Sequence, residues 1–424
     1  MSLEIPFSPP RIDQKIIDEV VDTLKSGWIT TGPKTKLFEK QLTAYTGAKA
    51  TLCLNSATAG LEIMLRWFGV KDGDEVILPA CTYGATANVI IHCGAKPVFV
   101  DTGNDFNISI KGMRKAITKN TKVIMPVDFG GWPCDYDEIN ALVNEPQYID
   151  MFDARTAIQK TLGRVLILSD SAHAIGAKYN GKMSGSFTDV SVFSFHAVKN
   201  ITTAEGGAIA LNLPPQFNNE EIYQYLTIKA NHGQSKNAMA KLQPGAWKYD
   251  IVEAGYKFNM TDIVASIGLV ELERYEADTL MRRKEIIAHY KQLLSGYSWA
   301  KLPVMKSDKK ESSYHLFPLR INGVSEQQRD EIIAQIGRKG IAVNVHFIPI
   351  PMMSYYKALG YDITDYPNSY NNYKAEISLP VYYDLSLHQV EQVVQTLADA
   401  VNNVLGNTPA LTKVKRQFFQ SVAR

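Results

Sequence analysis

Between residues 50 and 212, short apolar and β-rich runs alternate with stretches of helical periodicity. The runs are EVILP, KPVFVD, KVIMPVD, RVLILSD, DVSVFSF and GGAIALN. Most of the segments between them are long enough for crossover helices, and this alternation is typical of an α/β fold with a mostly parallel sheet. Residues 144–163 make one crossover longer than it needs to be, so we expect a surface insertion there.

Helical periodicity marks the segments before and after this core. Residues 16–28 and 30–47 predict an N-terminal arm and then an amphipathic helix that enters the main body. Residues 218–245 are polar and poorly periodic, whereas residues 261–296 have apolar positions at helical spacing and predict one long helix that could bridge two domains.

The last third of the chain mixes both patterns. Residues 315–322 and 341–347 are strand-like, and residues 326–340 and 386–405 predict helices. We therefore predict a large domain with an N-terminal arm and a smaller α+β domain that ends in a basic tail after Gly406. The predicted boundaries are 1–296 for the large domain and 297–424 for the small one.

Composition narrows the classes of partner. The 424 residues include 45 Lys+Arg and 43 Asp+Glu, interspersed along the chain, so no basic run favours nucleic acid or an anionic membrane. The chain has no stretch of about 18 apolar residues and does not open like a signal peptide. Its four cysteines form no C-x-x-C pair, which suits a reducing compartment. We expect a cytoplasmic protein that binds a small molecule.

The segments SDSAHAIGA (169–177) and SVFSFHAVKNITTAEGG (191–207) carry the clearest chemistry. Asp170 closes an apolar run, and ligands of open α/β sheets bind beyond the carboxyl ends of the strands. Ser194, His196 and Lys199 follow the next run and would share this edge. A lysine in a partly dry pocket has a lowered pKa and becomes the nucleophile that Schiff-base chemistry requires.

Two further segments complete a set of functional groups. In LCLNSATAGLEIML (52–65), small polar residues lead into a helix, whose N-terminus is a favourable place for a phosphate. PACTYGATANVI (79–90) places Tyr83 at the same edge, where a flat ring can stack on another. An amine, a carboxylate, an aromatic ring and a phosphate cradle are together what pyridoxal phosphate needs. We find no metal-binding cluster, no G-x-G-x-x-G after a strand and no P-loop.

These motifs resemble the DegT/DnrJ/EryC1/StrS family of sugar aminotransferases, within the fold type I pyridoxal-phosphate enzymes. The resemblance runs from SGWITTGPKTKLFE (26–39) through FSFHAVKNITTAEGG (193–207) and GYKFNM (255–260) to SLPVYYDLS (378–386). It implies a mostly parallel central sheet with a smaller α+β C-terminal domain.

The resemblance also implies roles for single residues. Lys199 would form the covalent link to the cofactor, Asp170 would pair with the pyridine nitrogen and His173 would contact the phenolic oxygen. The expected phosphate contacts are Ala57, Thr58 and Ser194, Tyr83 would stack on the ring, and Lys257 would reach the phosphate of a partner subunit. The sequence departs from the family pattern at Lys257, where many members have asparagine, at Asn259, where they have arginine, and at Pro351-Met352, which replaces a common His-Leu pair. The insertion at 144–163 and the tail after Gly406 also lie outside that pattern.

The activity that the resemblance implies is transamination of a nucleotide-linked keto-sugar, most similar to that of the C4 aminotransferases, with glutamate as amino donor. It also implies a homodimer with shared active sites. One alternative is a sugar dehydratase of the same family, which the presence of Lys199 disfavours because those members replace the lysine with histidine. Another is a regulatory relative that keeps the fold without turnover. The identity of the sugar and its nucleotide is left open.

Overall fold

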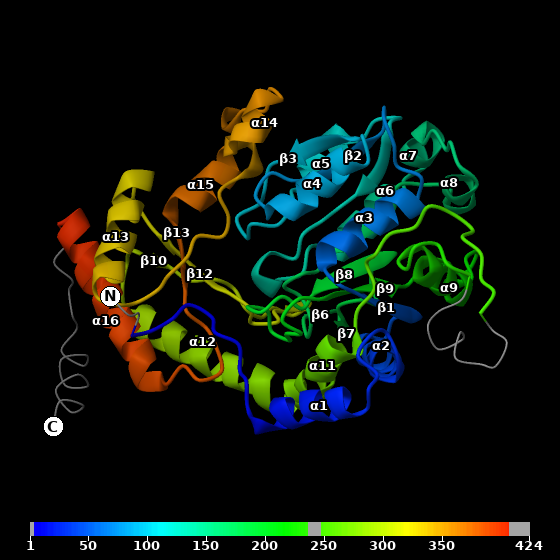
Figure 1. Cartoon of the computed structure of the whole chain (residues 1–424). Coiled ribbons are helices and arrows are strands. Elements are labelled where there is room, and N and C mark those ends of the chain that lie inside the picture. Colours follow the sequence, from blue (N-terminus) through cyan, green and yellow to red (C-terminus); the bar gives the residue numbers. More distant parts are fainter. Residues whose placement is uncertain (1–3, 236–246, 407–424) are drawn as a thin grey trace.

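The computed structural model describes residues 4–235 and 247–406, and its centre is a seven-stranded sheet in the order β1-β9-β8-β5-β4-β2-β3 (Figure 1). The strands are β1 (Ala50–Leu54), β2 (Glu75–Pro79), β3 (Lys96–Val100), β4 (Thr121–Ile124), β5 (Leu166–Asp170), β8 (Val190–Ser194) and β9 (Gly207–Leu211). Only β9 runs against the others in this sheet, since it pairs antiparallel with both β1 and β8. The predicted mostly parallel sheet is therefore confirmed.

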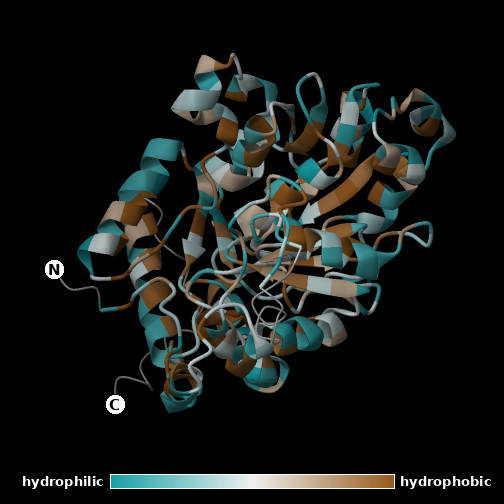
Figure 2. Ribbon diagram, turned by 45° about the vertical axis from the view of Figure 1, so that its right-hand side comes forward, coloured by the Kyte–Doolittle hydropathy of each residue, from teal (hydrophilic) through white to brown (hydrophobic). Residues whose placement is uncertain are grey.

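The apolar runs form strands because both faces of the sheet are covered. Every residue of β1, β5, β8 and β9 is buried, and parallel strands that are buried on both faces contain continuous apolar runs. One face packs on α3 (Ala57–Trp67) and α4 (Gly84–His92), and the other packs on α5 (Ile110–Ala116), α6 (Tyr136–Val143) and α11 (Asp262–Arg274). Hydrophobic residues accordingly concentrate in the central strands (Figure 2).

The C-terminal part has its own small sheet. This sheet contains β10 (Ala300–Lys301), β12 (Phe317–Ile321) and β13 (Glu376–Leu379) in that order. It shares a hydrophobic cluster with α13 (Glu326–Arg338) and α16 (Leu387–Leu405). A third sheet contains β11 (Lys310–Glu311), β6 (Lys178–Tyr179) and β7 (Lys182–Met183) in that order. In it, β11 of the C-terminal part pairs with β6, which lies in the connection between β5 and β8 of the large sheet.

The long helix predicted over residues 261–296 is present and has a bulge in its middle. Helix α11 continues through a π-helical turn, η2 (Tyr275–Thr279), into α12 (Leu280–Leu294), which packs on α16. The N-terminal arm also reaches the C-terminal part, because Ile5 forms a β-bridge with Ile341. The domain boundary between residues 296 and 297 stays a prediction.

The remaining helices surround this frame. They are α1 (Gln14–Lys25), α2 (Pro33–Thr46), α7 (Pro146–Met151), α8 (Ala157–Leu162), α9 (Asn219–Lys229), α14 (Ser354–Ala358) and α15 (Pro367–Ala375), with short 3-10 turns η1 (Phe129–Gly131), η3 (Ile350–Met352) and η4 (Ile363–Asp365). No helix among the described residues is both long and apolar enough to cross a bilayer.

One sequence-based expectation, the strand at residues 341–347, was wrong. Residues 341–347 are no strand, since only Ile341 and Asn344 form isolated bridges. The N–H of His346 donates instead to the carboxylate of Glu376 (2.8 Å), which takes the place of a ladder bond. The polar segment 218–245 contains α9, which Asn218 caps through its side chain.

The insertion at 144–163 is tied to the core by side chains. It forms α7 and α8, and the Gln159 amide donates to the carbonyl of Phe68 (2.9 Å). The Lys122 amine donates to the carbonyl of Asp153 (2.6 Å). All four cysteines are buried and free. The tail expected after Gly406 lies outside the described residues.

Candidate active site

Asp170 is the last residue of β5, and its carboxylate is buried at the carboxyl end of the sheet. Its Oδ2 accepts a hydrogen bond from the Thr86 hydroxyl (2.7 Å), and its Oδ1 accepts one from the N–H of Ala172 (3.2 Å). Burial raises the pKa of Asp170, and these bonds oppose that effect. Both donors are neutral, so no cation among the described residues is bonded to this carboxylate. A buried carboxylate in this setting favours a cationic ligand atom.

Lys199 lies in a turn that follows β8. Its backbone N–H donates to the carbonyl of His196 (2.9 Å). Burial lowers the pKa of the Lys199 amine to about 8, and the charge of Asp170 acts in the opposite direction. The amine therefore has a much larger neutral fraction near neutral pH than an exposed lysine has, and the neutral amine is the nucleophile. The fold thus brings Asp170 and Lys199, predicted from separate motifs, into one electrostatic environment.

His173 is buried beside these two residues with a defined pattern of hydrogen bonding. Its Nδ1 faces the backbone N–H of Gly130 (3.2 Å), which can only donate, so Nδ1 carries the lone pair and Nε2 carries the proton. Burial and the charge of Lys199 hold the pKa of His173 well below its usual range. The imidazole is therefore neutral and has one N–H donor, which suits the predicted contact to an oxygen.

The start of α3 is a capped helix N-terminus that lies against β9. Ser56 caps the helix by accepting a hydrogen bond from the N–H of Ala59 (3.1 Å). The N–H groups of Ala57 and Thr58 belong to the first turn, where backbone donors have no intrahelical partner, and the helix dipole favours an anion there. The predicted phosphate cradle is thus a real helix N-terminus.

Gly207 shows how closely the strands approach this helix start. A Cβ at Gly207 would lie 2.3 Å from the backbone nitrogen of Ala57, so a larger residue would push α3 away. Gly207 pairs with Leu54 on β1 and with Ser194 on β8. Ser194 is therefore at the same edge as the helix start, as predicted.

Tyr83 and His196 are the exposed members of the predicted set. Tyr83 is the N-cap residue of α4, is 65% exposed and contacts the Phe347 ring at a centroid distance of 5.9 Å. Its stacking role stays a prediction. The His196 side chain is also exposed and lies 3.7 Å from the Glu205 carboxylate, away from the buried groups.

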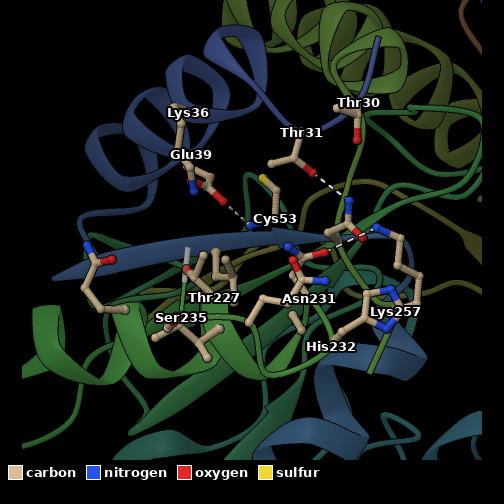
Figure 3. A pocket seen from close by; sticks show the side chains of 16 residues that line it. Thr30, Thr31, Lys36, Glu39, Cys53, Thr227, Asn231, His232, Ser235 and Lys257 are labelled. Carbon is tan, nitrogen blue, oxygen red and sulfur yellow. Dashed lines mark hydrogen bonds and ion pairs between the residues drawn. The ribbon is translucent and has the colours of Figure 1, made fainter. Parts of the chain in front are cut away.

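Lys257 does not join Lys199 within the single chain. Its carbonyl accepts a hydrogen bond from the Asn55 amide (3.2 Å) beside the start of α3, but its amine donates to Asn231 Oδ1 (3.3 Å). That contact lies at a pocket of about 390 Å³ between α2, β1 and the end of α9 (Figure 3). Neither Lys199 nor Asp170 lines this pocket.

Sequence reasoning missed three residues that surround the predicted ones. Thr86 falls inside a motif that was singled out only for Tyr83, and its hydroxyl at a helix start near a strand end was the available signal. His315 and His346 have no local signal, because they come from the C-terminal part of the chain. Burial lowers the pKa of both, with the charge of Lys199 contributing, and that of His346 falls to about 3.

A lysine amine, a buried carboxylate and a helix N-terminus at one edge of such a sheet define the class of fold type I pyridoxal-phosphate enzymes. A family model described as the DegT/DnrJ/EryC1/StrS aminotransferase family matches residues 10–398, and the chain belongs to this family. Aminotransferases of this family depend on pyridoxal phosphate, so the protein is a pyridoxal-phosphate-dependent aminotransferase.

Similar proteins agree over nearly the whole chain. Spr1654 of Streptococcus pneumoniae, assigned as a sugar aminotransferase, has a PMP-form structure that is 48% identical, with a TM-score of 0.91 and coverage of 95% of this chain and 100% of that one. The spore coat polysaccharide biosynthesis protein SpsC of Bacillus subtilis is 36% identical, covering 94% of this chain and 97% of its own. The UDP-4-amino-4-deoxy-L-arabinose–oxoglutarate aminotransferase of Shewanella sediminis is 32% identical, covering 94% and 98%.

The residues present fit the cofactor. The Asp170 carboxylate is buried without a bonded cation among the described residues, and a protonated ring nitrogen would supply one. The first-turn N–H groups of α3, which Ser56 caps, suit a phosphate.

We predict that Thr86→Val weakens cofactor binding by about 10- to 100-fold, because a hydrogen bond to a charged group contributes about 1.5–3 kcal/mol. The measurement is an absorbance titration of the apoprotein with pyridoxal phosphate. Thr51→Val is the matched control, since the buried Thr51 hydroxyl has no hydrogen-bond partner among the residues that the structure describes. Equal dissociation constants for Thr86→Val and the wild type would show that Asp170 does not need this bond.

We also predict the pH dependence of cofactor capture. The rate at which the apoprotein takes up pyridoxal phosphate should rise with pH with a midpoint near 8, because the pKa of Lys199 is lowered and only the neutral amine reacts. Asp170→Asn should move the midpoint to lower pH, since the Asp170 charge favours the protonated amine. Stopped-flow absorbance measures the rate, and a midpoint at the ordinary lysine pKa would contradict the lowered pKa of the Lys199 amine.

Proposed function

We propose that this protein transfers an amino group from glutamate to the C4 keto carbon of a nucleotide-linked sugar. The observation that carries the transamination is the pairing of a half-buried lysine of lowered pKa with the buried Asp170 carboxylate. The choice of substrates is supported by the relative from Shewanella sediminis, whose name places the amino group at C4 of a UDP-sugar and pairs it with oxoglutarate, the keto acid that glutamate becomes.

The cofactor, when bound, supplies a carbonyl group that takes up the amino group and a ring that withdraws electrons from the reacting carbon. Lys199 would hold it through Nζ, and the same amine, when free, would carry a proton to and from the substrate carbon. The carboxylate of Asp170 holds the proton on the ring nitrogen, and Thr86 orients that carboxylate. His173 donates from Nε2 to the phenolic oxygen, consistent with its Nδ1 being occupied by Gly130.

The remaining predicted contacts anchor and cover the cofactor. Ala57 and Thr58 would hold the phosphate through the helix N-terminus, Ser194 would add a hydroxyl, and Tyr83 would stack on the ring. Since Tyr83 is largely exposed here, a second copy of the chain is expected to cover it.

We infer a homodimer with shared active sites, in which Lys257 serves the partner's phosphate. Two observations support it: the Lys257 amine does not reach its own lysine site, and Val198, next to Lys199, is an exposed apolar residue. We place the reaction in the cytoplasm, because four free buried cysteines suit a reducing compartment.

The decisive experiment is optical. Protein reconstituted with pyridoxal phosphate should have a visible absorption band, glutamate should bleach it, and Lys199→Ala should not form it. Lys199→Arg, which keeps the positive charge beside Asp170 but cannot form the link, should also lack it, whereas Lys40→Ala on the exposed surface of α2 should behave as the wild type. Wild-type protein that stays colourless with added cofactor would refute the proposed function.

A panel of nucleotide keto-sugars then tests the substrate. Protein bleached with glutamate should regain its band with a nucleotide 4-keto-sugar and not with a 3-keto-sugar, and mass spectrometry should find an amino-sugar. Recovery only with 3-keto-sugars would overturn the C4 assignment, and loss of a hydroxyl group from the sugar would identify a dehydratase instead.

A further inference from the structure

Asn200, the residue directly after Lys199, is the centre of a buried hydrogen-bond network. Its side-chain amide donates to the Tyr275 hydroxyl (3.0 Å) and to the carbonyl of Ser313 (2.7 Å), and its Oδ1 lies 2.9 Å from Nδ1 of His315. Both donor hydrogens and the carbonyl oxygen are therefore used. The three partners are 75, 113 and 115 residues away along the chain.

The same partners hold the segment that carries His173. The Tyr275 hydroxyl donates to the carbonyl of Ile175 (2.8 Å), and the Ser313 hydroxyl donates to the carbonyl of His173. The Tyr275 ring also packs so close to Gly176 that a Cβ at Gly176 would lie 2.6 Å from the ring. Asn200 is thus connected to the loop between Asp170 and β6 by two routes, one through Tyr275 and one through Ser313.

The chemistry of each partner fixes the orientation of the network. The Ser313 carbonyl can only accept, so the Asn200 nitrogen must face it and the Asn200 oxygen must face His315. An amide oxygen can only accept, so His315 Nδ1 carries the proton and its Nε2 carries the lone pair. His173 has the opposite tautomer, and the two rings lie 4.4 Å apart between centroids.

Besides Asn200, the Lys199 turn is tied to the N-terminal arm, because the Ser8 hydroxyl donates to the carbonyl of Val198 (3.3 Å). Lys199 and His196 close the turn by a backbone hydrogen bond within it, which does not fix its place relative to Asp170. The Asn200 amide connects the turn to the helical bulge η2 and to the C-terminal part of the chain. All four side chains of the network, Asn200, Tyr275, Ser313 and His315, are buried, which favours a single arrangement.

We propose that Asn200 is a positioning residue for the aminotransferase reaction, which sets Lys199 relative to Asp170 and His173 through Tyr275, Ser313 and His315. This assignment rests on the proposed function. Asn200 touches none of the reacting atoms in this scheme. It acts by fixing the position of the lysine turn relative to the segment that carries His173.

The test is Asn200→Ala in the holoenzyme, with circular dichroism of the visible band as the main readout. The ellipticity per unit absorbance reports how rigidly the cofactor is held, and it should fall to about half or less, while kcat falls by about 10- to 100-fold, as expected for a misplacement of about 1 Å. KM for the amino donor should change much less than kcat. Asn212→Ala is the matched control, because the Asn212 amide also donates to two carbonyls but lies at the other end of β9.

The outcomes distinguish the positioning role of Asn200 from the proposed aminotransferase function. A wild-type protein without a visible band would overturn both. A lower melting temperature for Asn200→Ala, with ellipticity per absorbance and kcat equal to those of the wild type, would overturn only the positioning role. If Asn200→Ala does not fold, Tyr275→Phe decides: it keeps the ring and removes the hydroxyl that joins Asn200 to Ile175, and unchanged ellipticity and kcat would refute the network.

Discussion

The structure depends on placing charged groups in a dry site at the carboxyl edge of the sheet. Burial raises the pKa of Asp170 and lowers that of Lys199 to about 8, so each group's own desolvation works against its charge. The interaction between them offsets only part of this cost. Among the described residues, the carboxylate of Asp170 is removed from water and hydrogen-bonded to neutral donors, so the site favours a ligand that carries a positive charge. The surrounding fold must keep these groups in position.

Segments that are distant in sequence meet around Asp170 and Lys199 and keep the site in position. The sheet brings the ends of β5 and β8 together, Thr86 arrives from the start of α4, and the start of α3 approaches β9 because Gly207 has no side chain. The C-terminal part contributes His315 and His346, both neutral because of burial and nearby positive charge. Neutral imidazoles beside Lys199 avoid a repulsion that would otherwise lower the pKa of the amine further.

Much of this arrangement was predictable because it is local. The apolar runs predicted the strands, and the order of small polar residues before an apolar helix predicted the cradle at Ala57 and Thr58. Tyr83 was placed correctly at a helix start, but its exposure could not be foreseen, since that depends on what packs against it. The strand expected at 341–347 failed because Glu376, an acid from a distant strand, takes the N–H of His346. Periodicity carries no information about such competition.

The sequence by itself determined the class of fold, the lysine and carboxylate, and the cofactor that suits them, because strand periodicity and the residue types at strand ends are local properties. Only the tertiary structure decided which groups surround them: the Thr86 bond to Asp170, the tautomers of the two histidines, and the network through Asn200. The physical reason is that burial, hydrogen-bond partners and pKa shifts depend on contacts between segments more than 40 residues apart, as between Gly130 and His173, separated by 43 residues, and between Asn200 and Tyr275, separated by 75.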